Sequence, residues 1–532
     1  MTINWEKKQW NTLTIEKIHG QVYKMRDIYE GKHIDHFERA QALLQKKEIN
    51  DPEEADLVSP VVRTPYIVMN IAKPVAETPA NLISRSIGKI TSSLKNNEAV
   101  NEAADAQGET TIDGEGEIDD LQNEMIRQIV KKSNLDSEHW SNIVQHQIDG
   151  GIVGMPVNDA KGLRIEFKSR DVFFPHDDGL GADIAYEVEI EEEKFLRVYR
   201  ERIVENKLSG DSDVVATHFL YYLNDTKLKL VEDVEAARLL GIDELVKTYP
   251  ARSDLFIKYL ANNKTFMKPW GVPAFDGLLG HQDEINIRLT RNAIIFERNS
   301  SPRLAVTDDI FAALEDDAFE RFGEAGRGFI NHELLEVVTM NENGQSMEVI
   351  QVDVKNIGGI EWVDKLIREV LVMTNTSQKA IDYFTDDATN NAVSGVAKFY
   401  DLFVSIVKAE RIQKEYVAFL KHLIEACLWL ENQDNALVIP EEPDIALNEM
   451  VPVTRTDLIA ENLAAYEAGA LSLETFVRRT NPFASEEWIQ EEITRIEEEK
   501  QTADSTGIPT MDDFNDQRDE EGNPIDAATE EE

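Results

Sequence analysis

Cysteine is almost absent from this sequence, because its 532 residues contain a single one, Cys427. One cysteine excludes any disulfide within the chain and fits assembly in a reducing cytosol. The neighbouring residues Leu423, Ile424, Leu428 and Leu430 are apolar. We therefore expect a buried thiol that behaves as a small hydrophobic side chain and is not reactive.

Long apolar runs are absent as well. No stretch approaches the roughly 18 apolar residues that a membrane-crossing helix needs, and the first ten residues are polar and charged. They do not form the apolar core of a secretory signal. The sequence therefore predicts no membrane span and no secretion through a signal peptide.

Positive charge is scarce, since 55 Lys and Arg face 101 Asp and Glu and the formal net charge is −46. Tight sequence-independent binding of DNA depends on cations that displace counterions from phosphate, so we expect any nucleic acid to be handled loosely or locally. An acidic wall would keep a polyanion from sticking to it. With 42% hydrophobic residues, most of the chain should fold, and its length favours two to four folding units.

Common signatures of enzymes are missing too. There is no phosphate loop, no dinucleotide-binding glycine fingerprint between a strand and a helix, and no Gly-x-Ser-x-Gly elbow. Glycines cluster at 150, 151 and 154 and at 323, 326 and 328, but no phosphate-loop lysine follows either cluster, so they predict turns or hinges. Carboxylates are so abundant that spacing alone singles out no pair for general acid or base work.

Two clusters of histidine and acidic residues resemble metal ligands. One is His176-Asp177-Asp178, and the other combines His281 with Asp283 and Glu284. Adjacent residues on one element point in different directions, whereas a hard cation needs several converging oxygens. We expect a loop and a solvated helix face, and hence no metal or cofactor.

The first half of the chain mixes helical and strand patterns. Apolar residues recur at helical spacing in 12–31 and in 69–90, the latter interrupted near Pro74 and Pro79. A polar acidic linker is expected over 95–117. Helices should follow at 118–132 and at 137–149, with Ser137 as a cap and Gly150 as a stop. Runs rich in β-branched and aromatic residues then predict a mostly antiparallel sheet, from strands at 163–167, 184–190, 195–203, 214–223 and 255–259.

The second half has a distinct order of elements. A helix is predicted over 274–299, followed by a hairpin of two strand-like runs, 334–340 and 347–352. A second helix is expected over 360–374 and a polar loop over 382–391. An uninterrupted helix of roughly 55 Å should then span 396–432. Further helices are predicted over 456–469 and between Ser472 and Lys500, before an acidic tail that is expected to be disordered.

This order of helix, β-containing insert, helix, polar loop and long helix resembles that of tailed-bacteriophage portal proteins. The sequence Asn-Asn-Ala-Val-Ser-Gly-Val-Ala at 390–397 is similar to the exit of the portal tunnel loop, where Ser394 would cap the long helix. Residues 469–475 resemble the portal crown. Residues 66–90 and Phe173-Phe174-Pro175 resemble the wing in siphophages of Gram-positive hosts.

The resemblance implies an α+β, portal-like fold whose parts follow in chain order. They are an α/β wing (1–272), a first stem helix (273–300), a clip (301–355), a second stem helix (356–381), a tunnel loop (382–395), a wing spine helix with its connection (396–450), a helical crown (451–500) and an acidic disordered tail (501–532).

The resemblance also implies a function. The chain would be a non-enzymatic subunit of a homo-oligomeric ring, usually a dodecamer, at one capsid vertex. The ring would be the channel through which double-stranded viral DNA is packaged and ejected, without sequence specificity. Its implied partners are the terminase large subunit, a head-completion or adaptor protein, and capsid and scaffolding proteins. The location would be the portal vertex of the virion, after assembly in the host cytoplasm. Alternatives are another phage head or connector protein, or a metal-dependent enzyme associated with packaging.

If the chain is a portal protein, two sets of residues are candidates for contact with DNA. The resemblance places the loop beside the duplex, with candidate lining residues Asp386, Asp387, Thr389, Asn390, Asn391 and Ser394. The stem helices carry Arg288, Arg291, Arg298 and Arg368, which either face the DNA backbone or form surface salt bridges with Glu284 or Glu369.

Overall fold

The computed structural model describes residues 22–50, 64–94, 112–205, 211–223, 228–300, 303–307, 336–340, 347–350, 359–379, 395–450, 455–481, 484 and 486–505. It contains both helices and sheets, which confirms the α+β class. The chain divides into two compact units. One comprises Met1–Asn391 with Tyr400–Met450, and the other comprises Ala392–Phe399 with Val451–Glu532.

The helices near the N-terminus partly follow the predicted pattern. Helix α3 spans Val22–Glu30 and ends, as predicted, at Gly31, whose positive φ of 92° suits glycine. The predicted residues 12–21 lie outside the described part. Helix α4, which was not predicted, spans Glu38–Gln45.

Helix α5, Ala72–Ser86, is continuous where the sequence predicted interruptions. Pro74 lies in the first turn, where a missing N–H costs little. Pro79 lies inside the helix and leaves the carbonyl of Val75 without its usual donor, but Lys408 Nζ donates to that oxygen at 3.3 Å. The helix also ends earlier than predicted, because Ile87–Thr91 forms strand β1, which pairs with β14, Asp444–Leu447.

Two helices precede the main sheets. Helix α7 spans Ile112–Lys132, so the linker prediction is wrong for 112–117, while 95–111 lie outside the described residues. Helix α8, Leu135–Asp149, begins after Asn134, and Ser137 donates to the carbonyl of Asn134 instead of capping the helix. Gly150, with a φ of 79°, ends α8 as predicted.

Two antiparallel sheets follow, so the predicted antiparallel pairing is confirmed, but the predicted single sheet is wrong. The larger has the order β4-β5-β6-β7-β8, with β9 also paired to β7, and the smaller has the order β10-β2-β3. Helix α9, Asp233–Leu240, lies between β8 and β9 in the chain. The strands are β2 Gly151–Val157, β3 Arg164–Ser169, β4 Phe173–Pro175, β5 Gly181–Ile190, β6 Glu193–Glu205, β7 Ser212–Tyr222, β8 Lys229–Leu230, β9 Val246–Tyr249 and β10 Lys258–Ala261.

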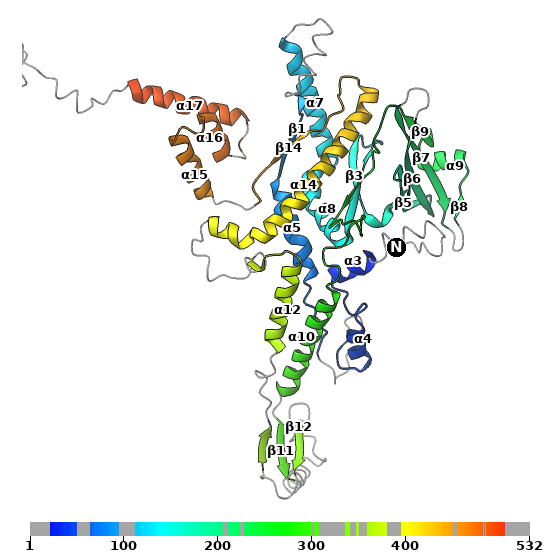
Figure 1. The fold of residues 1–532 in the computed structure, drawn as a ribbon, viewed down its shortest axis with the longest axis vertical. Helices are drawn as coiled ribbons and strands as arrows, with labels where there is room; N and C mark the ends of the chain where they lie inside the picture. Colours follow the sequence, from blue (N-terminus) through cyan, green and yellow to red (C-terminus); the bar gives the residue numbers. More distant parts are fainter. Residues whose placement is uncertain are drawn as a thin grey trace, which may run out of the picture. The chain divides into compact units, whose positions relative to one another are not determined.

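The long helix predicted over 396–432 is confirmed as α14, Gly395–Asp434, which lies beside α5 and α8 (Figure 1). It packs closely on β2, because a Cβ added at Gly154 would stand 2.4 Å from Leu423 Cδ1. Cys427 is fully buried in α14, which confirms its structural role, and burial raises the pKa of its thiol.

The two predicted stem helices are present as α10, Leu279–Ser300, and α12, Gly359–Met373. Helix α10 begins five residues later than predicted. The described residues between them form three strands, namely β11 Arg303–Thr307, β12 Glu336–Met340 and β13 Met347–Ile350. The hairpin prediction is wrong, because β12 and β13 do not pair with each other. Each pairs with β11 instead, β12 in parallel and β13 antiparallel.

The second unit holds helices α15 Arg455–Glu467, α16 Leu473–Thr480 and α17 Glu486–Ser505. Ser472 caps α16 as predicted, since its Oγ accepts from Thr475 N at 3.2 Å. Helix α17 extends to Ser505, so the predicted disordered tail is wrong for 501–505, and 506–532 lie outside the described residues. Among the described residues, no helix is both long and apolar enough to span a bilayer.

Candidate functional site

Helices α10 and α12 pack through an apolar core that also includes the start of α5. Ile285 of α10 contacts a stripe of α12 formed by Val363, Leu366 and Val370. These three residues recur at helical spacing and are at most 5% exposed, which explains why the sequence predicts α12 well. Ile71 and Val75 complete the cluster and connect the helix pair to the body of the unit.

One face of α10 carries polar side chains that bind the backbone of an extended segment. Gln282, Asn286 and Thr290 are all nearly inaccessible to solvent and follow one another at intervals of four residues, so they form a row along the helix. Each accepts a backbone N–H from the segment before α5. The bonds are Ile71 N to Gln282 Oε1 (3.2 Å), Met69 N to Asn286 Oδ1 (3.1 Å) and Ile67 N to Thr290 Oγ1 (3.0 Å). We call this row the polar ladder.

A buried histidine extends the polar ladder toward α3. Asn286 Nδ2 donates to His33 Nδ1 at 2.7 Å, and His33 Nε2 lies 2.8 Å from the carbonyl of Ile28. Both contacts are satisfied only by the neutral imidazole that carries its proton on Nε2. Burial lowers the pKa of His33, which favours this neutral form. The polar ladder therefore fixes α10 in one position along the extended segment.

The polar ladder was not predicted from the sequence, although α10 carries a signal for it. Three uncharged polar residues at four-residue spacing interrupt the apolar stripe of α10. Buried polar side chains require partners, so such a row indicates a partner with free backbone donors. The sequence alone does not reveal that residues 67–71 are this partner.

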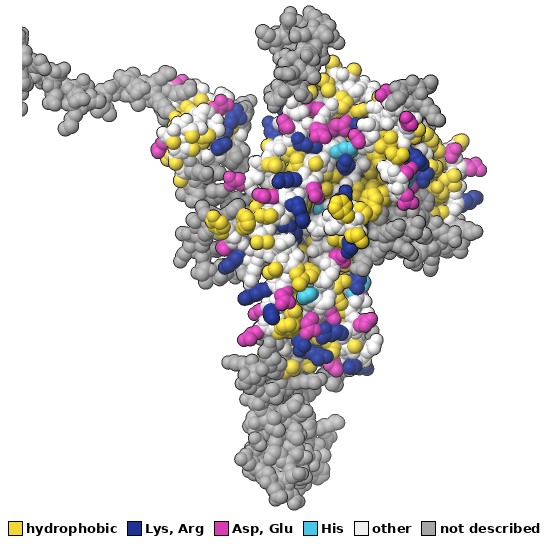
Figure 2. Space-filling view, in the orientation of Figure 1, with side chains coloured by type: hydrophobic (Ala, Val, Ile, Leu, Met, Phe, Trp, Pro, Cys, Tyr) yellow, Lys and Arg dark blue, Asp and Glu magenta, His cyan; other side chains and the backbone are white. Residues whose placement is uncertain are grey.

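Three of the four stem arginines have described side chains, and all three are exposed to solvent. Arg288 and Arg291 are exposed on α10, on the face opposite to the polar ladder, and Arg368 is exposed on α12. Arg298 belongs to α10, but its side chain lies outside the described part. Arg288 Nε donates to Glu284 Oε1 at 2.7 Å, which is the surface salt bridge weighed in the sequence analysis. Figure 2 shows acidic and basic side chains intermixed over the described surface.

The proposed tunnel-loop residues Asp386, Asp387, Thr389, Asn390, Asn391 and Ser394 all lie outside the described part of the chain. The described residues before the loop are held in place. Ser377 N donates to Ser405 Oγ of α14 at 2.7 Å, and Ser377 Oγ donates to the carbonyl of Asp401 at 2.5 Å. The short segment that follows α12 is thus bonded to α14, the helix that follows the loop in the chain.

The first histidine cluster is engaged in ion pairs. His176 Nε2 lies 2.9 Å from Asp183 Oδ1, and Arg200 donates to both oxygens of the same carboxylate, at 2.8 and 2.9 Å. Asp178 pairs with Arg202 at 2.7 Å. A surface pocket of about 290 Å³ lies beside these residues. Because two guanidinium groups hold Asp178 and Asp183 and add positive charge beside His176, this arrangement does not suit a cation.

The second histidine cluster is also divided among other partners. Arg39 of α4 donates to Glu284 at 2.7 Å and lies 3.5 Å from Asp283. Burial alone would raise the pKa of Glu284, but the hydrogen bonds from Arg288 and Arg39 lower it overall. Within the described ranges, no group of three or more His, Cys, Asp or Glu side chains could hold a metal ion.

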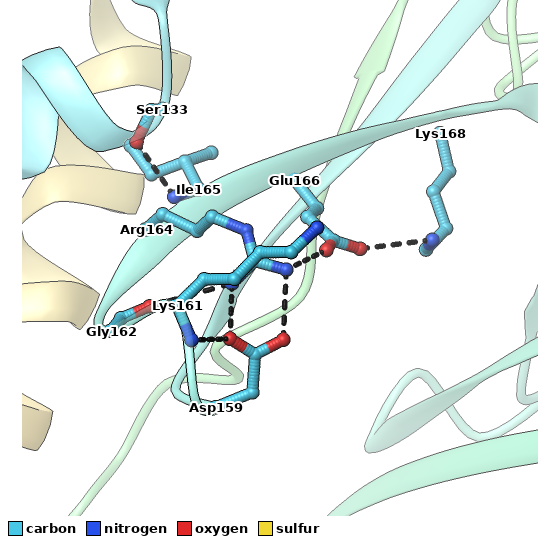
Figure 3. A network of polar contacts seen from close by, with 8 residues as sticks. All are labelled: Ser133, Asp159, Lys161, Gly162, Arg164, Ile165, Glu166 and Lys168. Atoms are coloured by element: carbon cyan, nitrogen blue, oxygen red, sulfur yellow. Dashed lines mark hydrogen bonds and ion pairs between the residues drawn. The ribbon is translucent and has the colours of Figure 1, made fainter.

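A carboxylate pair at the β2–β3 turn illustrates how acidic side chains are used here. Arg164 donates to Asp159 and Glu166, Lys168 donates to Glu166 at 3.1 Å, and Ser133 accepts the Ile165 N–H (Figure 3). The hydrogen bond from Arg164 lowers the pKa of Asp159 to about 2. Both acids therefore stay charged at neutral pH, which suits an ion-pair network and not proton transfer.

One carboxylate has a pKa near neutrality. Burial raises the pKa of Glu201 on β6 to about 7. Its oxygens accept from Tyr199 Oη at 2.7 Å and from Ile257 N at 2.9 Å, and its side chain is inaccessible to solvent. Because solvent does not reach Glu201, its role is structural. It holds the residues that precede β10 against the larger sheet.

Comparison with known proteins adds no family assignment. No protein-family model matches this sequence, and no curated protein matches it significantly.

Proposed function

We propose that this chain is a portal protein of a tailed bacteriophage, a subunit of a homo-oligomeric ring at one capsid vertex. The observation that carries the proposal is the order of elements in the second half of the chain. A 22-residue helix, a small three-stranded sheet, a 15-residue helix and a 40-residue helix follow one another. This is the order in which stem, clip, stem and spine occur in the family that the sequence resembles.

The packing of α10 supports a role in a channel wall. A wall that borders moving DNA must keep its shape under load, and a helix held only by apolar contacts can slide along its neighbours. The polar ladder opposes such sliding, because moving α10 by one residue would break three hydrogen bonds at once. The apolar contacts with α12 hold the pair together from the other side.

The charge distribution supports passage of DNA without tight binding. The net charge is −46, and Arg288 is neutralised by Glu284. An excess of acidic side chains repels phosphate on average, so a duplex could move along the protein without being held tightly. The three-stranded sheet and the segments around it would dock the terminase large subunit and later a head-completion or adaptor protein, while capsid and scaffolding proteins would surround the ring. ATP hydrolysis would belong to the terminase.

The first test is native mass spectrometry of the full-length protein, with negative-stain images of the same sample. We expect a closed ring of about twelve or thirteen subunits with a central hole. A monomer or an open dimer at every salt concentration would refute the proposal.

A second test addresses the channel. Deleting 386–391 should leave ring assembly intact and reduce the yield of DNA-filled heads, because these residues are proposed to contact DNA and not to hold the fold. A matched deletion is available in the acidic tail, at 520–525, and it should leave the yield of filled heads unchanged. An unchanged yield after the loop deletion would refute the role of the loop.

A further inference from the structure

A tight turn at Thr265–Lys268 lies between β10 and α10 in the chain. Thr265 N donates to the carbonyl of Lys268 at 3.3 Å, and Lys268 N donates back to Thr265 O and to its Oγ1, both at 3.1 Å. Gly271 N donates to Lys268 O at 3.1 Å. Four hydrogen bonds within seven residues give this turn a defined shape.

The base of the turn is anchored to the rest of its unit on both sides. Arg411 of α14 donates to Asn263 Oδ1 at 2.7 Å, and Lys268 Nζ donates to Asp276 Oδ2 at 2.8 Å. Just beyond it, Gly271 has a φ of 75° and is so tightly enclosed that a Cβ there would lie 2.4 Å from Asn262 O. The turn is therefore presented on a rigid base.

The tip of this turn consists of two large apolar residues that the fold does not use. Phe266 is 106% exposed and Met267 is 90% exposed, the highest values among the large apolar side chains that the structure describes. Turn tips ordinarily carry Gly, Asn, Asp or Ser. Two neighbouring apolar side chains held out by a rigid turn lose little conformational freedom when a partner covers them.

The charges around the tip indicate what covers it. Lys264 and Lys268 flank the two apolar residues. Lys268 is paired with Asp276, whereas Lys264 has no ion-pair partner among the described residues and leaves one positive charge unbalanced beside the tip. The chain as a whole carries 46 more acidic than basic side chains. The surface of another copy of this chain is therefore acidic on average and complements a cationic, apolar tip. A closed ring is built from contacts between two different surfaces of the subunit, so the turn need not meet its own counterpart.

We infer that the Thr265–Lys268 turn is a contact element between subunits, which buries Phe266 and Met267 against an acidic surface of the neighbouring copy of this chain. The inference rests on the proposed ring and names one element that holds neighbouring subunits together. Burial of the two side chains would strengthen each contact on the order of a hundredfold.

Photo-crosslinking tests the inference directly. A benzophenone amino acid at position 266 of the full-length protein should yield covalent dimers and higher oligomers on irradiation, with adducts that map to acidic peptides of the same chain. The matched control carries the same probe at Val234, which is 87% exposed on α9 and should give few adducts. Adducts only with unrelated proteins or with added lipid vesicles, or none at all, would refute the inference.

Substitution provides a second measurement. The double variant Phe266→Ser/Met267→Ser should shift the native mass spectrum from ring to monomer, whereas Val234→Ser should leave the ring unchanged. The unfolding midpoint of the double variant should match that of the wild-type monomer, because Phe266 and Met267 are exposed in the monomer. If the wild type forms a ring and the double variant forms the same ring, this inference is refuted but the proposed function is not. A wild-type protein that never oligomerises would refute the proposed function itself.

Discussion

Replacing Asn286 with alanine should lower the free energy of unfolding by about 2–4 kcal/mol. Asn286 is inaccessible to solvent, so its loss leaves two groups without a partner. His33 Nδ1 is also inaccessible and loses its donor, at a cost of about 1–3 kcal/mol. The Met69 N–H is only partly buried and loses its acceptor, which adds about 1 kcal/mol.

The assay is urea unfolding at pH 8, followed by circular dichroism. Arg291→Ala is the matched control, because it lies on the same helix, changes to the same residue and starts from an exposed side chain. It should change stability by no more than about 0.5 kcal/mol. If Asn286→Ala also stays within about 1 kcal/mol of the wild type, the polar ladder does not hold α10 and the reasoning fails.

Three further predictions concern the packing around the sheets. The raised pKa of Glu201, about 7, lies above its unfolded value, so wild-type stability falls as pH rises from about 4.5 to 7. Glu201→Gln should gain about 3 kcal/mol relative to the wild type over that range, and a pH-independent difference in urea unfolding would contradict this. Gly271→Ala should destabilise the protein by more than about 3 kcal/mol, because its Cβ would collide with two backbone oxygens. Gly179→Ala, which has a φ of 70° but open space around it, should cost about 1 kcal/mol, and similar thermal midpoints for the two variants would refute the argument. Arg26→Met should cost about 3–5 kcal/mol in urea unfolding, because it leaves the fully buried carboxylate of Asp149 unpaired. A loss below about 1 kcal/mol would show that the pair contributes little.

Helices with a continuous local pattern could be predicted from the sequence. Helices α12 and α14 carry apolar stripes at helical spacing without Pro or internal Gly, and their bounds lie within two residues of the prediction. Gly31 and Gly150 mark helix ends because only the residues next to them decide whether a positive φ is needed. The burial of Cys427 follows from the same local stripe.

Strand pairing was harder to predict because it depends on distant segments. Strand β2 was missed because six of its seven residues are buried, so it lacks the alternation that marks a half-exposed strand. Strands β12 and β13 look like a hairpin from their short separation. Their pairing is decided instead by β11, which lies 29 residues or more before them and offers both of its edges.

Composition and local periodicity were enough to predict the class of the fold, the order of its long helices and its net acidity, and to show that common enzyme motifs are absent. These follow from composition and from periodicity over one or two helical turns. The partners of the buried polar groups, by contrast, depend on contacts between distant segments. Pro79 remains inside a helix because Lys408 reaches the carbonyl it leaves free, and α10 is held by backbone donors more than 200 residues away. Folding brings such partners together from distant parts of the chain, so no local sequence pattern predicts them.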